Sequence, residues 1–459
     1  MCRQTKDGGM EITMEKNLTT GSVLKTVLSF SLPFLLSYFL QTLYGMADLF
    51  IIGQFNSVDS TTAVSIGSQA MHMLTVMIVG LAMGSTILIG RAVGGGKTSE
   101  ASRAIANTVI LFLCLSIALT VILFFSVKPL AAILSTPTEA IAETISYLTI
   151  CFAGIPFITA YNIISSIFRG LGDSKSPMFF IAIACTANII LDYLFIGALG
   201  LGAAGAALGT TISQAVSVAV SFLVILKQKN GISLAAKDFR PHKATMKELL
   251  KIGIPVALQD GFIQISFITI TVFANRRGLN DAAAVGIVEK LIGILFLIPS
   301  TMLSTVSALC AQNIGAGKHA RARLTLRYAS SIALLWGIAA VFIMQLFAEP
   351  FIKLFTGNAS VVLLGSQYMR GYVWDCILAG IHFCFSGYFC AYGLSCISFL
   401  HNALSILCAR IPLAYLASRY YWDTLFPMGL ATTTGSMLSV IICLVAYLWL
   451  NKKQTINCV

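Results

Sequence analysis

The sequence predicts an all-α polytopic membrane protein with twelve transmembrane helices. Apolar residues make up 57% of the 459 residues, whereas Asp, Glu, Lys and Arg together make up 10%, against about a quarter in soluble globular domains. The apolar residues form continuous runs close to the roughly 20 residues that a helix needs to cross a bilayer. A membrane β-barrel would instead show alternating segments of about ten residues. These observations exclude a soluble enzyme, a disordered chain and a disulfide-stapled secreted domain.

Twelve apolar runs mark the expected helices in order along the chain, six in each half. The first six runs cover residues 26–52, 61–90, 104–127, 139–168, 178–198 and 203–226. The second six cover residues 248–275, 282–310, 324–346, 361–392, 395–418 and 425–450. The seventh and tenth runs are the weakest, because Gln259, Asp260, Arg370 and Asp375 interrupt them.

The chain repeats one plan in its two halves. Ala63-Val64 and the loop Gly94–Lys97 recur 221 residues later as Ala284-Val285 and Gly315–Lys318, and Tyr147 recurs as Tyr368. We predict an N-terminal tail over residues 1–25, a six-helix bundle over 26–226, a basic linker over 227–247, a second bundle over 248–450 and a C-terminal tail over 451–459. Both bundles would enter the membrane from the same face, with a cavity between them, which is typical of transporters.

The positive charges predict the topology. The net charge is +12, and 22 of the 30 Lys and Arg residues fall on the side of the N-terminus and the even-numbered loops. Positively charged loops are retained in the cytoplasm. We therefore expect a multi-pass protein of a bacterial-type inner (plasma) membrane with both termini cytoplasmic, in contact with membrane lipid and without a nucleic-acid partner.

Motifs of soluble enzymes are absent or out of context in this sequence. Gly96-Lys97-Thr98 resembles the end of a phosphate-binding loop, but Arg91 stands where that pattern needs glycine. The twelve Cys residues form no CxxC pair and no Cys/His ligand spacing. We expect no enzyme and no cofactor.

Several segments together resemble the multidrug and toxic compound extrusion (MATE) family of the MOP flippase superfamily over nearly the whole chain. They are Ala47-Asp48 to Ile52-Gly53, the Gly94–Lys97 and Gly315–Lys318 loops, Arg169-Gly170-Leu171-Gly172-Asp173, Asn188-Ile189-Ile190-Leu191-Asp192 and Gly205-Ala206-Ala207. The resemblance implies a V-shaped pair of bundles that exports organic cations or other amphiphiles in exchange for H⁺ or Na⁺.

Two acids within the predicted spans belong to polar stripes on otherwise apolar helices. Ser37, Gln41, Tyr44 and Asp48 recur every three or four residues, and Asn188 and Asp192 lie one turn apart. Ala206, Thr210 and Gln214 follow the same spacing in the sixth span. We expect the stripes to face one another or a wet cavity. Independent interhelical hydrogen bonds are the structural alternative.

The residue types in these stripes predict a cation-coupling site. A carboxylate at membrane depth is costly unless paired or protonated, so Asp48 and Asp192 together would hold either a proton or a sodium ion. The side chains of Asn188 and Thr210 and the carbonyl of Ala206 would add oxygen ligands, with no other metal expected. The resemblance implies a cation site here, with Tyr44 and Tyr147 close by and Pro33 as a hinge.

The second half lacks equivalents of these residues, because Asp48, Asn188 and Asp192 correspond to Ile270, Ala409 and Leu413. We therefore expect coupling in the first half. A second cation site remains open at Asp260, Glu289 and Asp375. The alternative for each of these acids is a helix-end position or a structural pair with Lys or Arg, which for Asp375 would be the nearby Arg370.

These features predict a secondary active antiporter, expected to be a monomer, that works by alternating access. Gln41, Tyr44, Asn162 and Phe168 would line a pocket for a small organic substrate. The main alternative is a flippase for lipid-linked or polysaccharide precursors, which would need a cationic cleft. An ion channel would need a filter-like segment, and none is visible in the sequence.

Overall fold

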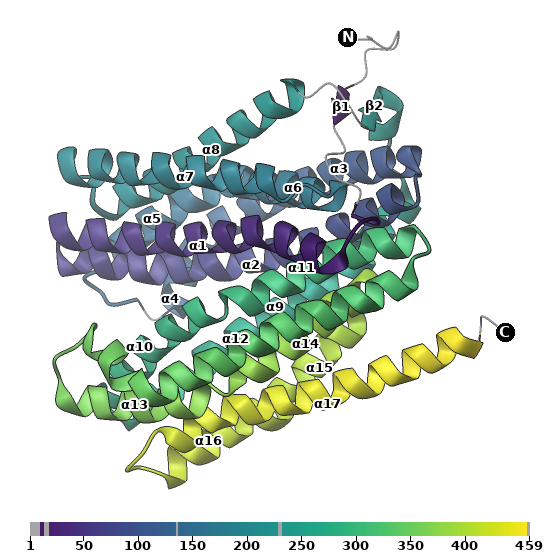
Figure 1. Ribbon diagram of the computed structural model, residues 1–459. Helices are drawn as coiled ribbons and strands as arrows, with labels where there is room; N and C mark the ends of the chain where they lie inside the picture. The colour runs from purple at the N-terminus through teal and green to yellow at the C-terminus, as the bar shows by residue number, and fades with distance from the viewer. Residues whose placement is uncertain (1–9, 13–17, 135, 228–231, 457–459) are drawn as a thin grey trace. The chain divides into compact units, whose positions relative to one another are not determined.

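The computed structural model describes residues 10–12, 18–134, 136–227 and 232–456, and nearly all of them are helical (Figure 1). The first half contains α1 (Val23–Phe55), α2 (Val58–Gly94), α3 (Thr98–Phe125), α4 (Val127–Ile133), α5 (Ile141–Ala153), α6 (Ile155–Leu171), α7 (Lys175–Asp192), η1 (Tyr193–Ala198) and α8 (Gly202–Lys227). The second half contains η2 (Ala236–Phe239), α9 (Lys243–Arg277), α10 (Leu279–Leu295), α11 (Leu297–Gly315), α12 (His319–Lys353), α13 (Ala359–Tyr372), α14 (Asp375–Ala391), α15 (Ser395–Ser405), η3 (Ile406–Arg410), α16 (Ile411–Tyr420) and α17 (Phe426–Ile456). Parts of the predicted tails and linker lie outside the described residues.

The predicted helical membrane fold is confirmed. Among the described residues, ten helices or unbroken helix series are long and apolar enough to cross a bilayer, and two bent pairs bring the total to twelve. The bent pairs are α5–α6, with a bend of 48°, and α13–α14, with a bend of 41°. Composition alone predicted each pair as one continuous span, because the apolar run continues through the break.

A short β-ribbon is the one departure from an all-helical chain that the described residues show. Strand β1 (Met10–Ile12) pairs antiparallel with β2 (Ile232–Leu234), with Met10 opposite Leu234, and the two lie side by side in Figure 1. The sequence analysis assigned these segments to a polar tail and a basic linker. Strands of three residues are too short for a two-residue hydrophobic period to reveal them.

By contacts, the chain divides into two compact units. Unit 1 comprises Met1–Thr20, Leu32–Gly253 and Ala311–Gly317, and unit 2 comprises Gly21–Ser31, Ile254–Cys310 and Lys318–Val459. The first part of α1 thus belongs to unit 2 and the first part of α9 to unit 1. Both changes of unit fall just before a proline, Pro33 or Pro255. The bundle boundaries drawn along the sequence stay predictions.

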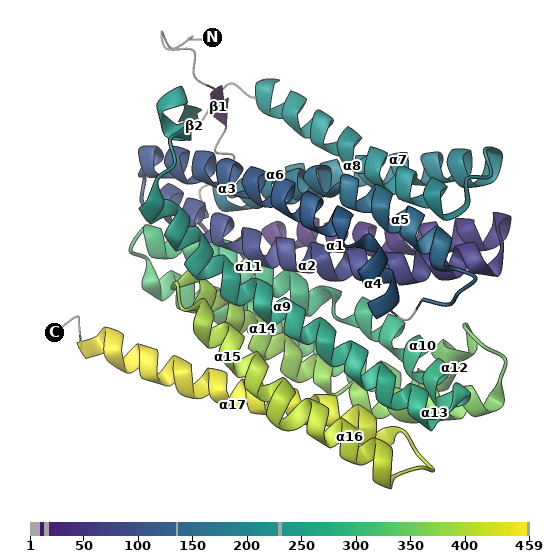
Figure 2. The same ribbon diagram turned by 180° about the vertical axis from the view of Figure 1, so that it is seen from behind.

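Within unit 1, α2 packs against α3, α5 and α6, while α8 packs against α5, α6 and α7. Both views show α7 and α8 side by side (Figures 1 and 2). One apolar cluster of this unit surrounds the buried ring of Tyr147 and includes Ile51, Ala63 and Leu148. The helices that carry Asp48, Asp192 and Thr210 therefore belong to one packed body.

The helices of unit 2 make the same contacts as the helices of unit 1 to which they correspond in the repeat. Helix α13 packs against α10, α12 and α17, and α14 packs against α12 and α17. The apolar cluster of this unit surrounds Tyr368 and includes Ala284, Val285 and Leu425. Because Ala63, Val64 and Tyr147 hold the matching places in unit 1, the repeat predicted from the sequence is also a repeat of packing.

The repeated glycine loops have a structural explanation within unit 1. A Cβ on Gly94 would overlap the backbone of Gln312, and a Cβ on Gly315 would overlap the backbone of Arg91. At the 221-residue offset Gly94 corresponds to Gly315 and Arg91 to Gln312, so the two close contacts are equivalent. Gly96 and Gly317 follow with φ of 71° and 70°, values that favour glycine. The motif thus serves a close crossing of backbones and two left-handed turns.

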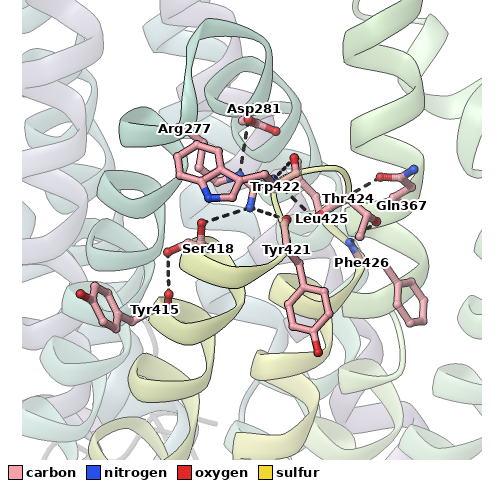
Figure 3. Close-up of polar contacts among 10 residues, drawn as sticks. All are labelled: Arg277, Asp281, Gln367, Tyr415, Ser418, Tyr421, Trp422, Thr424, Leu425 and Phe426. Carbon is pink, nitrogen blue, oxygen red and sulfur yellow. Dashed lines mark hydrogen bonds and ion pairs between the residues drawn. The ribbon is translucent and has the colours of Figure 1, made fainter.

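In unit 2 an arginine at the end of α9 holds the loop that follows α16 (Figure 3). Arg277 donates to the carbonyl oxygens of Tyr421 at 2.8 Å and Trp422 at 2.9 Å, and more weakly to that of Ser418 at 3.3 Å. Its Nε lies 3.4 Å from Asp281 Oδ2, and its guanidinium lies 5.5 Å from the Trp422 ring centre. Because the last carbonyls of a helix lack intrahelical donors, Arg277 caps α16 and fixes the turn into α17.

Candidate functional site

The structure brings the four predicted cation-coupling side chains together inside unit 1. Asp48 of α1 is 3% exposed, and Asn188 and Asp192 of α7 are fully buried. The Thr210 hydroxyl of α8 donates to Asp48 Oδ2 at 3.3 Å, and Asn188 Nδ2 donates to Asp192 Oδ1 at 3.4 Å. The Asp48 carboxyl also interacts with the side chains of Asp192 and Asn188. The polar stripes of three helices therefore face one another.

Local structure positions Asp192 at a change in helix geometry. It is the last residue of α7, and the π-helical segment η1 begins at Tyr193. Such segments are rare and are frequent at functional sites, because the wider turn shifts the side chains that follow it. Composition gave no sign of this segment.

Gly209 is a residue of the site that the sequence analysis missed. A Cβ at this position would overlap Asp192 Oδ1 and lie 3.6 Å from Asn188 Nδ2. The bare backbone of α8 thus makes room for the carboxyl group one residue before Thr210. The signal in the sequence is the run of small residues Gly202–Ala207 followed by Gly209, because small residues let helix backbones approach closely.

Three oxygens at the centre of the site have no hydrogen-bond partner among the described residues: Asp48 Oδ1, Asn188 Oδ1 and Asp192 Oδ2. Leaving a buried polar atom unsatisfied costs about 1–3 kcal/mol. Carboxylate and amide oxygens are hard ligands that suit H⁺ or Na⁺. Ala206, which is fully buried one turn before Thr210, lies on the same face of α8. The residues present therefore fit a small monovalent cation.

Two tyrosines flank these oxygens. The Tyr44 side chain interacts with Asp48 and Thr210, and Tyr147, 2% exposed, interacts with Asp48 and Tyr44. The Tyr147 ring lies over Gly67, where a Cβ would meet its Cε1 at 2.7 Å. Both tyrosines thus lie beside Asp48, and their part in cation coupling stays a prediction.

The residues predicted to touch substrate lie in different environments. Gln41 is partly buried and interacts with Tyr161. Asn162 is 6% exposed and donates from Nδ2 to the Ile158 carbonyl at 2.8 Å, and Phe168 packs edge-on against Phe180 at 5.6 Å. Substrate contact by these residues and by Tyr44 stays a prediction, as does the hinge at Pro33, which is buried inside α1.

The three acids proposed for a second cation site are not one cluster. Asp375 forms an ion pair of 3.1 Å with Arg410, and Glu289 accepts from Thr271 at 3.2 Å and interacts with Arg410. Asp260 is on a different helix, α9, and lies near Cys390. The suggested pairing of Asp375 with Arg370 is wrong, because Arg370 lies 3.7 Å from Glu349 instead.

A family model described as MatE matches this chain twice, over residues 33–194 and 255–416. The chain belongs to the MatE family. The two matches begin 222 residues apart and have the same length, so each half is one copy of the MATE unit. The resemblance stated from the sequence and the internal repeat are both confirmed. The chain is a multi-pass membrane protein of a transporter family.

MATE relatives and structures cover most of the chain. It is 28% identical over 404 residues to the probable multidrug resistance protein YpnP of Bacillus subtilis, covering 88% of this chain and 90% of that protein. It is 24% identical over 365 residues to the multidrug export protein MepA of Staphylococcus aureus, covering 80% and 81%. The fold also matches a solved multidrug resistance MATE transporter described as outward-facing, with a TM-score of 0.88, 23% identity and coverage of 95% and 97%.

Proposed function

We propose that this protein is a secondary active antiporter that exports amphiphilic or cationic organic compounds in exchange for H⁺ or Na⁺. Membership of the MatE family and relatives named as multidrug exporters support the transport of drugs. The observation that carries the exchange is the convergence of three unpartnered oxygens from Asp48, Asn188 and Asp192 in the interior of unit 1.

In the proposed mechanism, the two carboxylates share one cation. When the site is empty, two neighbouring negative charges repel each other in a poorly hydrated interior, and a proton or sodium ion removes that repulsion. A cation shifts a conformational equilibrium only if it binds one conformation more tightly than the other. We propose that uptake at Asp48 and Asp192 favours the conformation that releases substrate outside, and that access alternates between the two six-helix bundles.

The flippase alternative receives no support from the basic residues of the spans. A pyrophosphate-linked precursor would need free cationic side chains, but Arg410 is engaged with Asp375 and Arg370 lies near Glu349. Of these three basic residues, only Lys290 is exposed, on α10, and a single lysine does not make a cationic cleft. The described residues therefore favour an exporter of cationic or neutral amphiphiles.

Substrate-evoked cation release from proteoliposomes tests the proposal. The purified protein is reconstituted, an organic cation such as ethidium is added, and H⁺ and Na⁺ release are followed with and without sodium in the buffer. An antiporter releases one of the two ions upon addition of substrate, and its flux scales with an imposed gradient of that ion. Substrate flux that is indifferent to both gradients would contradict antiport and favour a flippase or a channel.

We further propose a plasma-membrane location with both termini cytoplasmic, and function as a monomer. The basis for the location and the topology is the concentration of 22 of 30 Lys and Arg residues on one side of the predicted topology.

A further inference from the structure

Unit 2 contains a buried ionic cluster centred on Arg410. Its Nη2 lies 3.1 Å from Asp375 Oδ2, and the two side chains are 9% and 0% exposed. The same Nη2 donates to the Tyr372 hydroxyl at 3.3 Å, and the guanidinium lies 5.3 Å from the ring centre of Phe267. The arginine is thus held by an acid, a hydroxyl and an aromatic face.

A second acid belongs to the cluster. Glu289 accepts a hydrogen bond from the Thr271 hydroxyl at 3.2 Å and interacts electrostatically with Arg410 and with Tyr368. The Tyr368 hydroxyl is buried with no hydrogen-bond partner among the residues that the structure describes. One guanidinium therefore stands among two carboxyl groups and two tyrosines.

The internal repeat relates this cluster to the site in the first half. Tyr368 corresponds to Tyr147, which interacts with Asp48 in unit 1. The acids, however, come from different positions, since Asp375 corresponds to Gly154 and Glu289 to Ser68 at the 221-residue offset. Arg410 corresponds to Ile189, the neighbour of Asn188. Each half therefore places at least one carboxyl group near the equivalent tyrosine, but the second half also supplies a cation of its own.

We propose that Arg410 is a built-in cation that occupies the acid cluster of the second half, so that the exchangeable cation binds in the first half alone. A guanidinium stays protonated and cannot leave, so Asp375 is neutralised in every conformation in which the pair persists. This role for Asp375 and Arg410 stands on the contacts within unit 2. The restriction of coupling to the first half rests on the proposed function.

The proposal predicts that removing the Arg410 side chain leaves an empty cation position next to Asp375. Truncating one member of a buried ion pair leaves an uncompensated charge and is strongly destabilising. In Arg410→Ala, the space and the facing carboxylates remain, so a free guanidinium ion should enter and restore the pair. Replacing Asp375 by Asn as well should reduce both the loss of stability and the rescue by the free guanidinium ion.

The test compares thermal melting of the detergent-solubilised full chain with and without methylguanidinium. We expect Arg410→Ala to melt several degrees below the wild type and to regain most of that loss in methylguanidinium. The double variant Arg410→Ala/Asp375→Asn should melt above Arg410→Ala and respond much less. If Arg410→Ala melts like the wild type without methylguanidinium, or if the double variant responds equally, the proposal is wrong.

A second measurement keeps the test decisive if Arg410→Ala does not fold. The double variant lacks both members of the Arg410–Asp375 ion pair, so it should then be recovered from membranes where the single variant is not. Loss of both variants would overturn the proposal, because it would mean that the arginine is needed for something other than neutralising Asp375.

Transport separates this inference from the proposed function. In proteoliposomes, Arg410→Ala should take up an additional cation for each substrate exported, because its second acid cluster is open. Methylguanidinium rescue without ion-coupled transport in the wild type would sustain the built-in cation and refute antiport. Ion-coupled transport in the wild type without methylguanidinium rescue of Arg410→Ala would sustain antiport and refute the built-in cation.

Discussion

Asp48 and Asp192 each keep one carboxylate oxygen without a hydrogen-bond donor among the described residues. An uncompensated buried polar atom costs about 1–3 kcal/mol, and a ligand that fills the site offsets that cost. Under the proposed mechanism, the same two carboxyl groups lower the stability of the empty site and bind the coupling cation.

Gly209 gives a residue-scale prediction. Gly209→Ala places a methyl group against Asp192 Oδ1, so the carboxyl group must move and cation-coupled efflux should fall to a small fraction of the wild-type rate. Gly45→Ala is the matched control, because a Cβ there meets no atom within 4 Å, and it should leave efflux unchanged. Equal efflux in the two variants would mean that the position of the Asp192 carboxyl is not critical.

Helical periodicity predicted that Asn188 and Asp192 lie side by side. It did not predict the space that Gly209 leaves for the Asp192 carboxyl group, or the pairing of Asp375 with Arg410 in the second half. Residues four apart share a helix face, so Asn188 and Asp192 were expected together, and the structure pairs them at 3.4 Å. The need for glycine at position 209 depends on how closely α7 and α8 approach. Arg410 is 35 residues from Asp375, so sequence proximity wrongly favoured Arg370.

The close crossing at the repeated glycine loops is a property of whole elements. A Cβ on Gly94 or Gly315 would overlap the facing backbone, and backbone cannot yield as a flexible side chain can. Gly94→Ala should therefore destabilise the protein by about 1–3 kcal/mol, seen as a lower melting temperature. Gly53→Ala, which meets no atom within 4 Å, should melt at or above the wild-type temperature. A Gly94→Ala protein as stable as Gly53→Ala would argue against the crossing.

Arg277 supports a second element-scale prediction. Charged hydrogen bonds contribute about 1.5–3 kcal/mol each, and Arg277 makes several of them to the carbonyls after α16. Arg277→Ala should lower the melting temperature and make the loop at Trp422 accessible to protease. Arg276→Ala, at the exposed neighbouring position, is the control and should change neither property. Equal protease resistance in both variants would show that the loop is held by other contacts.

Apolar run lengths predicted every long helix, because each run alone is enough to fix a membrane-spanning segment. The breaks escaped prediction, since Gly154 and the Val373–Trp374 pair lie inside continuous apolar sequence. At Gly154, a Cβ would lie 2.7 Å from the Thr211 side chain, so the bend accompanies a close approach of α8. Such approaches are tertiary and leave no periodic signal.

At the scale of the whole chain, the repeat was the most informative sequence feature. It extends to backbone conformation, where the left-handed glycines Gly96 and Gly172 recur as Gly317 and Gly393. Assignment of the first parts of α1 and α9 to opposite units could not be predicted, because it depends on which surfaces pack together. If the chain is simply divided into two consecutive halves, the first parts of α1 and α9 are each assigned to the wrong unit.

The basic linker gives a prediction about topology. Lys237, exposed in η2, should be cytoplasmic. In a cysteine-free background, Lys237→Cys should react with a membrane-impermeant maleimide in inverted vesicles and not in intact cells. Labelling in intact cells would rule out the proposed twelve-span topology with cytoplasmic termini.

The central claim is that Asp48 and Asp192 couple a cation to export, and gradient-driven efflux by the Asp→Asn variants tests it most directly. Asp48→Asn and Asp192→Asn each remove a charge while preserving volume, so each should keep a melting temperature near that of the wild type and lose nearly all gradient-driven efflux. Glu289→Gln and Asp260→Asn should lose less. Wild-type efflux in Asp48→Asn, or a greater loss in Glu289→Gln than in Asp192→Asn, would place the coupling site in the second half and contradict this account.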